Sequence, residues 1–203
     1  MSESRGARSP AARGIELPRE APEADDEILR SAEAGDVRGA LARCARLYGA
    51  SIGRLCMAML GSQVDADDVT QETLLTAHQN LAQFRRESSI RSWLLGIARN
   101  KCLQHIEKSR RRGAHLWLVK AEEQEAPMPE DTRALRQRAE RARALLDRVK
   151  PSDREALILR YTAMLSFKDV ATACGIAEPA ARQRVSRALT RLRGVMKEED
   201  SDA

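Results

Sequence analysis

The chain has few aromatic residues, and this shortage excludes a strand-rich fold. Only 3% of its 203 residues are Phe, Trp or Tyr, whereas strands need aromatic and β-branched residues to fill a pleated surface. Alanine, leucine, arginine and glutamate dominate instead, and these residues favour helices. The composition predicts an all-α protein, and its length allows one large domain or two small ones.

Cysteine is also scarce, and its spacing excludes two further classes of protein. The four cysteines, Cys44, Cys56, Cys102 and Cys174, are scattered, with no C-x-x-C pair among them. A disulfide framework or a zinc site requires closer and more regular spacing. We therefore expect the cysteines to be small core residues in a reducing compartment, and we expect no metal and no other cofactor.

Long apolar runs are missing as well. No stretch approaches the roughly 20 apolar residues of a membrane span, and the first residues lack the apolar segment of a signal peptide. We therefore expect a cytoplasmic protein without membrane insertion. Lysine and arginine total 35 against 30 acidic residues. This small excess permits nucleic-acid binding, but the placement of the charges decides whether it occurs.

Helical periodicity divides the chain into two helical domains with a flexible connection. Residues 1–24 hold only Ile15 and Leu17 as sizeable apolar groups, too few to offset the entropy of ordering. The segment after residue 112 is rich in proline and acidic residues, which is typical of a linker. The predicted parts are a disordered tail (1–24), a first helical domain (25–112), an acidic linker (113–132), a second helical domain (133–197) and a C-terminal tail (198–203).

The second domain contains the pattern of a helix-turn-helix. Ser152 with Glu155 and Ser166 with Asp169 predict capped helix starts, and Gly175 predicts a left-handed helix end. Pro179 then falls in the first turn of a further helix, where its missing N–H costs nothing. A short capped helix, a glycine turn and a second helix together indicate a helix-turn-helix.

The last helix has one apolar face and one basic face. At about 100° per residue, the apolar side is predicted to hold Ala181, Val185, Ala188, Leu189, Leu192 and Met196. The other side presents arginines and Gln183. Guanidinium groups suit phosphates and the O6/N7 edge of guanine, and a glutamine amide suits adenine. The alternative is a solvated arginine face, which the preceding capped helix and turn disfavour.

The segment "VDADDVTQETL" carries a cluster of carboxylates. Asp65, Asp68 and Glu72 lie at i, i+3 and i+7, so we expect them to share one helix face, with Gln71 beside them. Such a cluster suits a metal site, acid–base catalysis or docking onto a basic partner. No histidine, nucleophile or phosphate-binding glycine loop lies nearby, so docking is the favoured interpretation.

Three motifs occur in one order: "DADDVTQETLLTA", "SWLLGIARNKCL" and the capped helix-turn-helix. In this order the chain resembles the extracytoplasmic-function (ECF) sigma factors of the sigma-70 class over about Asp25 to Met196. The resemblance implies a region 2 bundle and a region 4 helix-turn-helix. It further implies an initiation factor, not an enzyme, that directs core RNA polymerase to a restricted promoter set, as in a stress response, under the control of an anti-sigma factor.

The resemblance also implies site residues. Docking on the coiled coil of the polymerase β′ subunit is implied for Asp65, Asp67, Asp68, Gln71 and Glu72. Capture of the minus-ten strand is implied for Arg85, Arg86, Arg91, Arg99, Asn100 and Lys101. Reading of the minus-thirty-five duplex is implied for Arg182, Gln183, Arg184, Arg187 and Arg191. The linker resembles the segment that runs toward the RNA exit region, which adds the β subunit to the expected partners, beside promoter DNA.

The chain departs from the usual family wording in the last helix. Pro179, Ala180 and Ala181 replace the common Gly-Thr-Val, and Gln183 replaces the common Ser. A promoter sequence therefore does not transfer from relatives. Two rival functions stay open at this point: a helix-turn-helix regulator that binds duplex DNA without polymerase, and a nucleic-acid enzyme with a metal held by Asp65, Asp68 and Glu72. Trp93 is expected in the core, because it shares an apolar stripe with Ile90 and Ile97.

Overall fold

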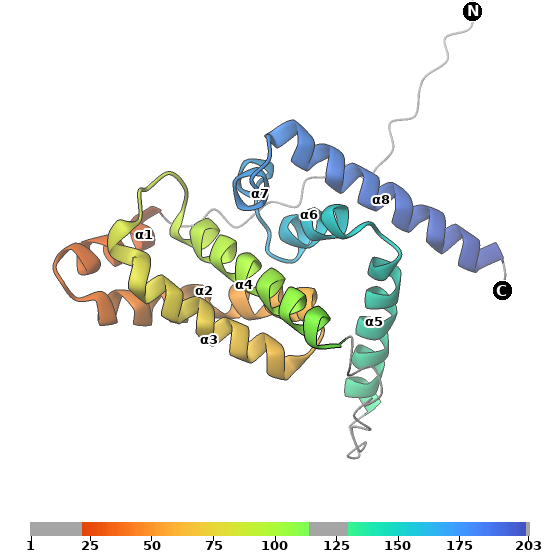
Figure 1. Ribbon diagram of the computed structural model, residues 1–203, viewed down its shortest axis with the longest axis horizontal. Coiled ribbons are helices and arrows are strands. Elements are labelled where there is room, and N and C mark those ends of the chain that lie inside the picture. The colour runs from red at the N-terminus through yellow and green to blue at the C-terminus, as the bar shows by residue number, and fades with distance from the viewer. Residues whose placement is uncertain (1–21, 114–129, 202–203) are drawn as a thin grey trace, which may run out of the picture.

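The computed structural model describes residues 22–113 and 130–201, and every regular element in these ranges is a helix (Figure 1). The elements are α1 (Pro22–Glu33), α2 (Val37–Leu60), α3 (Gln63–Asn80), the 3-10 helix η2 (Leu81–Gln83), α4 (Ile90–Gly113), α5 (Glu130–Asp147), α6 (Pro151–Tyr161), α7 (Phe167–Cys174) and α8 (Glu178–Ser201). The prediction of an all-α chain with two helical domains is confirmed.

Three helix boundaries differ from the expected ones, and most of the expected tail and linker lies outside the described residues. Helix α1 begins at Pro22, inside the expected tail, because proline suits the first turn of a helix and Glu23 and Asp25 follow it there. Helix α5 begins at Glu130, inside the expected linker. Helix α8 continues to Ser201, past the expected start of the C-terminal tail.

The first domain is a bundle of α1 to α4, and local sequence sets its turns. Gly35, with φ of 86°, ends α1, and the side chain of Asp36 caps α2 by accepting from the Gly39 amide at 2.8 Å. Gly61 ends α2 in the left-handed region, and Ser62 caps α3. The first of these tight turns places α1 beside α2, and the second places α2 beside α3.

Asp25 fixes the entry of α4, a contact that the sequence reasoning did not find. Its two carboxylate oxygens accept from the Tyr48 hydroxyl at 2.7 Å and from the Ile90 amide at 2.9 Å. The Ile90 amide is the first of the helix, and no residue of its own helix can accept from it. One carboxylate therefore joins α1, α2 and the start of α4.

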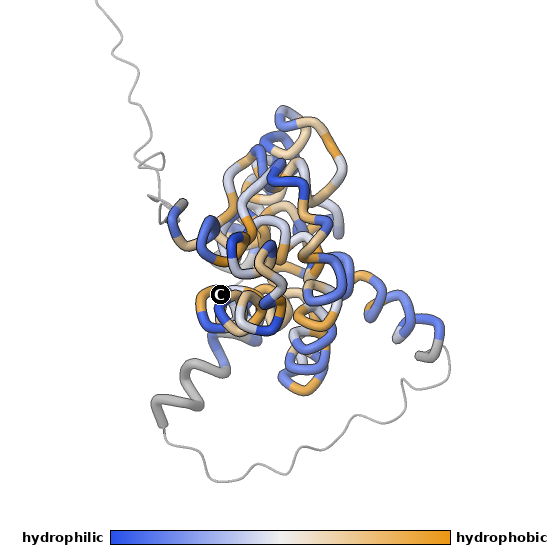
Figure 2. The backbone as a smooth tube through the Cα atoms, turned by 90° about the vertical axis from the view of Figure 1, so that its left-hand side faces the viewer, coloured by the Kyte–Doolittle hydropathy of each residue, from blue (hydrophilic) through white to orange (hydrophobic). Residues whose placement is uncertain are grey.

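The core of the bundle contains the expected cysteines and Trp93. Cys44, Cys56 and Cys102 are all at most 1% exposed. Trp93 is half-buried against the core, and its ring lies 5.2 Å from that of Phe84. The core expectation is confirmed for these residues. Figure 2 shows hydrophobic and hydrophilic residues alternating along the helices, as amphipathic packing requires.

The second domain contains the helix-turn-helix, and one of its two predicted caps is wrong. Ser166 caps α7 by accepting from the Asp169 amide at 3.1 Å, and Gly175 ends that helix with φ of 64°. Helix α6 instead begins after Lys150, with no side-chain cap. The Ser152–Glu155 capping box does not form, because Pro151 takes the first helical position and Glu155 pairs with an arginine of the first domain.

The two domains pack against each other. Helix α4 contacts α7, and α2 contacts α6. Figure 1 shows α4 and α7 as neighbours. The buried residues of both domains form one continuous cluster. Across this contact, Arg99 of α4 pairs with Glu155 of α6, and Arg91 of α4 donates to the Ala163 carbonyl at 2.6 Å. None of the helices in the described ranges is long and apolar enough to cross a membrane.

Candidate nucleic-acid interface

Helix α8 buries one stripe of small residues and exposes basic residues. Ala181, Val185 and Ala188 are buried, as predicted, and Val195 completes the stripe. The prediction for Met196 is wrong: its side chain is 53% exposed, because the 3–4 spacing from Ala188 continues through Leu192 to Val195 and rotates Met196 outward. Small buried residues let α8 lie close to α6 and α7, with which it packs.

The predicted duplex-reading residues lie on the solvent side of α8. Arg182, Gln183, Arg187 and Arg191 are exposed, and Arg184 is half-buried. Arg182 pairs with Glu178 at 2.5 Å and lies 4.4 Å from the centre of the Phe167 ring. Arg191 donates to the Arg148 carbonyl at 3.4 Å. The side chains form one basic surface, and several of them are already held in place.

Arg187 is the most firmly held of these arginines. Its Nε and Nη2 donate to Oδ2 and Oδ1 of Asp153, at 3.0 and 2.8 Å. The hydrogen bonds from Arg187 hold the pKa of the Asp153 carboxyl below its ordinary value, against the opposing effect of burial. The same contact raises the pKa of Arg187. Sequence reasoning missed Asp153, since no local pattern places it opposite α8.

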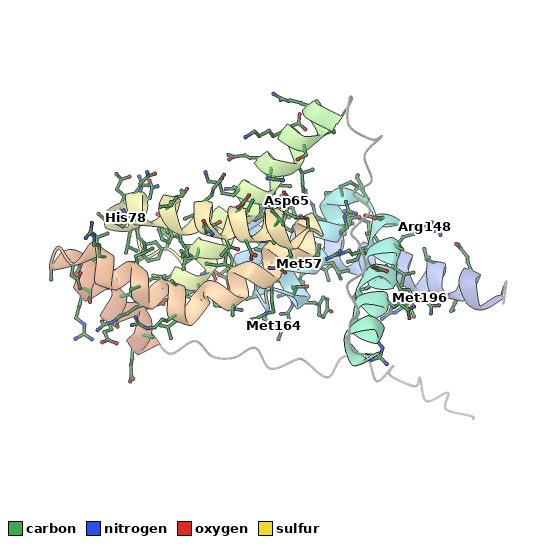
Figure 3. All side chains as sticks on the ribbon, turned by 90° about the horizontal axis from the view of Figure 1, so that it is seen from below. Met57, Asp65, His78, Arg148, Met164 and Met196 are labelled. Atoms are coloured by element: carbon green, nitrogen blue, oxygen red, sulfur yellow. The ribbon has the colours of Figure 1, made fainter. Side chains whose placement is uncertain are left out.

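The acidic segment forms the outer face of α3. Asp67, Asp68, Gln71 and Glu72 are exposed, whereas Asp65 is half-buried and lies 3.3 Å from Nε2 of His105 on α4. Asp65 therefore lies at the inner edge of the face, and Figure 3 shows it at the end of α3 opposite His78. Within the described residues, no group of three or more His, Cys, Asp or Glu side chains is placed to hold a metal ion.

Two apolar side chains accompany these carboxylates. Val64 is 71% exposed and Leu75 is 64% exposed, and both lie on α3. Positions 64, 68, 71 and 75 follow the four–three–four spacing of a single helix face. Exposed large apolar residues beside carboxylates are typical of a protein-binding surface. The four–three–four spacing of Val64 and Leu75 with the polar residues is the sequence signal of this apolar component.

The predicted minus-ten residues split into two groups. Arg85 and Asn100 are exposed, and Arg86 is exposed but pairs with Glu33 of α1 at 2.8 Å. Lys101 lies near Glu72 of α3, with 3.8 Å between their charged atoms. Arg91 and Arg99 form the second group and contact the second domain, as described above. The Arg99 and Glu155 side chains are only 16% and 12% exposed.

This second group shows that the domain contact covers part of the predicted strand-binding surface. The Arg99 guanidinium donates to Glu155 and, through Nη1, to the Asn100 side chain at 2.8 Å. A nucleic-acid strand needs these same N–H donors for its phosphates. A strand bound at the predicted surface would therefore compete with the second domain for Arg91 and Arg99. Sequence reasoning missed Glu155 as a partner, because the two residues lie 56 positions apart.

The arrangement as a whole is that of a two-domain helix-turn-helix protein with an acidic face on α3 and a basic face on α8. Comparison with known proteins matches each domain separately. The family model described as sigma-70 region 2 matches residues 45–112, and the one described as sigma-70, region 4 matches residues 136–192. The ECF RNA polymerase sigma factor EcfG of Rhodopseudomonas palustris (strain TIE-1) is 32% identical over 151 residues, which cover 72% of this chain and 79% of the relative.

A second relative and two solved structures agree with this match. The ECF RNA polymerase sigma factor SigM of Mycobacterium tuberculosis (strain ATCC 25618 / H37Rv) is 31% identical over 168 residues, covering 83% of this chain and 82% of the relative. The sigma factor RpoE of Bartonella quintana, solved with the anti-sigma factor NepR, is 25% identical with a TM-score of 0.60, covering 75% of this chain and 94% of that one.

CnrH, solved with the cytosolic domain of CnrY, shares the fold at 22% identity and a TM-score of 0.66, covering 89% of this chain and 99% of that one. Together, the two family models and the curated relatives identify the protein's family. The chain belongs to the extracytoplasmic-function group of the sigma-70 family of RNA polymerase sigma factors.

Proposed function

We propose that this sigma factor binds core RNA polymerase through the outer face of α3. The observation that carries this proposal is the exposed stripe of Val64, Asp68, Gln71 and Leu75 on one helix face. Carboxylates steer a basic partner into register, and the flanking apolar residues supply surface to bury on contact. The basic partner is a coiled coil of the polymerase β′ subunit.

Purified core polymerase tests this surface directly. The Asp68→Ala variant is expected to lose most of its binding in a pull-down, because it removes the central charge of the stripe. The matched control is Glu23→Ala, which removes an exposed carboxylate on α1, away from α3. Normal binding by Asp68→Ala, or equal losses by both variants, would contradict the proposed surface.

Promoter recognition involves the basic face of α8 and the predicted minus-ten residues of the first domain. Helix α8 reads the minus-thirty-five duplex with Gln183, Arg184 and Arg187, while Arg182 and Arg191 hold phosphates. The surface from Arg85 to Lys101 captures the displaced minus-ten strand. The bases of that strand bind hydrogen-bond donors, and its phosphates bind cationic side chains. The protein itself performs no covalent chemistry and acts in the cytoplasm, where polymerase and promoter DNA meet.

The contact between the domains makes the free protein a poor DNA binder. Arg91 and Arg99 hold the second domain in this arrangement, and a strand at the same surface requires the domains to separate. Binding of α3 to polymerase is the step that accompanies separation. An anti-sigma factor that binds the closed arrangement would act on the opposite side of this equilibrium. That the chain has an anti-sigma partner is supported by the solved complex of the Bartonella RpoE with NepR.

One comparison separates this function from that of a polymerase-independent regulator. Binding of the chain to duplex promoter DNA is measured with and without core polymerase. A sigma factor binds weakly alone and tightly with polymerase. A helix-turn-helix regulator would bind equally in both cases, and that result would contradict the proposal.

A further inference from the structure

The Arg187–Asp153 ion pair on the duplex-reading side of α8 differs from an ordinary surface ion pair, because only one of its two side chains is exposed. The Arg187 side chain is 49% exposed, whereas the Asp153 side chain is only 7% exposed. Asp153 lies in the first turn of α6, and Arg187 lies on α8, 34 positions later. An exposed arginine is thus fixed by a buried anchor.

The geometry defines which donors of Arg187 are used and which are left. Asp153 accepts from Nε and from Nη2, the side-on edge of the guanidinium. A guanidinium has five N–H bonds, so two on Nη1 and one on Nη2 are not used by Asp153. These three lie at the outer end of the side chain. Two of them, one from each nitrogen, form a fork that matches two neighbouring acceptors.

Among the bases, guanine presents this pair of acceptors. Its O6 and N7 lie side by side in the major groove, and arginine is their commonest bidentate partner. The Asp153 contact fixes the direction of the Arg187 fork before DNA binds, so less side-chain freedom is lost on binding. Arg187 shares the exposed face of α8 with Gln183 and Arg191, the face that the proposed function places in the groove.

We propose that Asp153 is a positioning residue that turns Arg187 into an end-on reader of one guanine in the minus-thirty-five element. The inference rests on the proposed function of α8 and deepens it by naming a base and the residue that sets its recognition. A purely structural role for Asp153 is the competing account, since the pair also ties α6 to α8. The two accounts differ in what a substitution does to base preference.

The test is a selection by the holoenzyme from duplex DNA randomised at the upstream element. Wild-type protein with core polymerase is expected to enrich guanine at one position that depends on Arg187. Arg187→Ala is expected to remove that preference. Asp153→Asn is expected to reduce it about tenfold at the same position, within the range of discrimination of a bidentate contact, and to leave other positions unchanged.

A matched control removes a different ion pair of the same domain. Asp147 pairs with Arg154 at the surface, and its side chain is 73% exposed. Asp147→Asn is expected to keep the wild-type preference at every position. Circular dichroism confirms the fold of each variant. Should Asp153→Asn not fold, Asp153→Glu gives the same comparison, because its carboxylate is displaced by one methylene and cannot hold the fork in the same direction.

Three results would overturn the inference. A folded Asp153 variant that keeps full guanine preference would exclude the positioning role. A uniform loss of binding at all positions would show that Asp153 is only structural. A wild-type selection without an Arg187-dependent guanine would remove the base assignment. These results can be told apart from a failure of the proposed function. If the proposed function fails, the wild-type holoenzyme will select the same sequences as core polymerase alone.

Discussion

Replacing Glu155 with alanine is expected to open the contact between the two domains. The Glu155 carboxylate accepts from Nε of Arg99, and both side chains are less than a sixth exposed. A hydrogen bond to a charged group in such a setting contributes about 1.5–3 kcal/mol. In an equilibrium between closed and open arrangements, this corresponds to a shift of roughly 10- to 150-fold toward the open form.

Removal of the Glu155 carboxylate weakens the contact between the domains more than it weakens the core of either domain. Glu155 does not cap its own helix, since α6 begins after Lys150 without a side-chain cap. After separation, the Arg99 guanidinium regains water, so no uncompensated buried charge is left behind. Each domain therefore keeps its fold while the pair moves apart. The Arg91 bond to the Ala163 carbonyl remains.

Small-angle scattering is the assay, with thermal unfolding as a second readout. The Glu155→Ala variant is expected to have a larger radius of gyration than the wild type and to unfold in two steps instead of one. Asp147→Ala, which removes an exposed ion pair, is the control and is expected to match the wild type. An unchanged scattering profile for Glu155→Ala would refute the argument that this ion pair holds the domains together.

Three further perturbations test separate parts of the structure. Ser166→Ala removes the cap of α7 and is expected to lower the stability by about 1 kcal/mol, seen as a lower melting temperature. Ser152→Ala is expected to leave the stability nearly unchanged, because its hydroxyl caps no helix. Equal effects of the two substitutions would contradict this assignment. The lowered pKa of Asp153 stabilises the fold at pH values above its ordinary value of 3.8. This stabilisation is lost as the pH falls through the pKa of Asp153 in the folded protein. The wild type and Asp153→Asn should therefore differ in stability at neutral pH and converge in acid. A difference in stability that does not change with pH would contradict this role of Asp153. Thiol labelling of the native protein should modify Cys174 first, because its side chain is only partly buried whereas Cys44, Cys56 and Cys102 are buried. Burial raises the pKa of Cys174 and raises that of Cys44 to about 11, so exposure and not pKa sets the order. Rapid labelling of all four thiols would exclude the described core.

The parts of the fold that local chemistry determines were predictable from the sequence. The left-handed glycines at 35, 61 and 175 and the Ser166 cap each depend on residues within one helical turn. The buried face of α8 follows from its periodicity, up to the point where Val195 and not Met196 continues the stripe. These features need no knowledge of the rest of the chain.

The remaining parts depend on contacts between distant residues, which periodicity does not encode. From the sequence alone, Asp25 is an ordinary acidic residue in a first helical turn. In the structure it accepts a hydrogen bond from the first amide of α4, 65 positions later. The sequence predicts Glu155 as part of a capping box, but its side chain forms an ion pair with Arg99 across the domain contact. Arg187 and Asp153 are likewise joined only by the packing of α6 against α8. In each case tertiary packing, and not local propensity, decides the partner.

In vitro transcription tests the assignment of this chain as a promoter-directing factor most directly. Core RNA polymerase is supplied with the purified protein on a library of promoter fragments, and transcript start sites are mapped. The account predicts discrete start sites that require the added protein and disappear with Asp68→Ala. Start sites identical to those of core polymerase alone would contradict it.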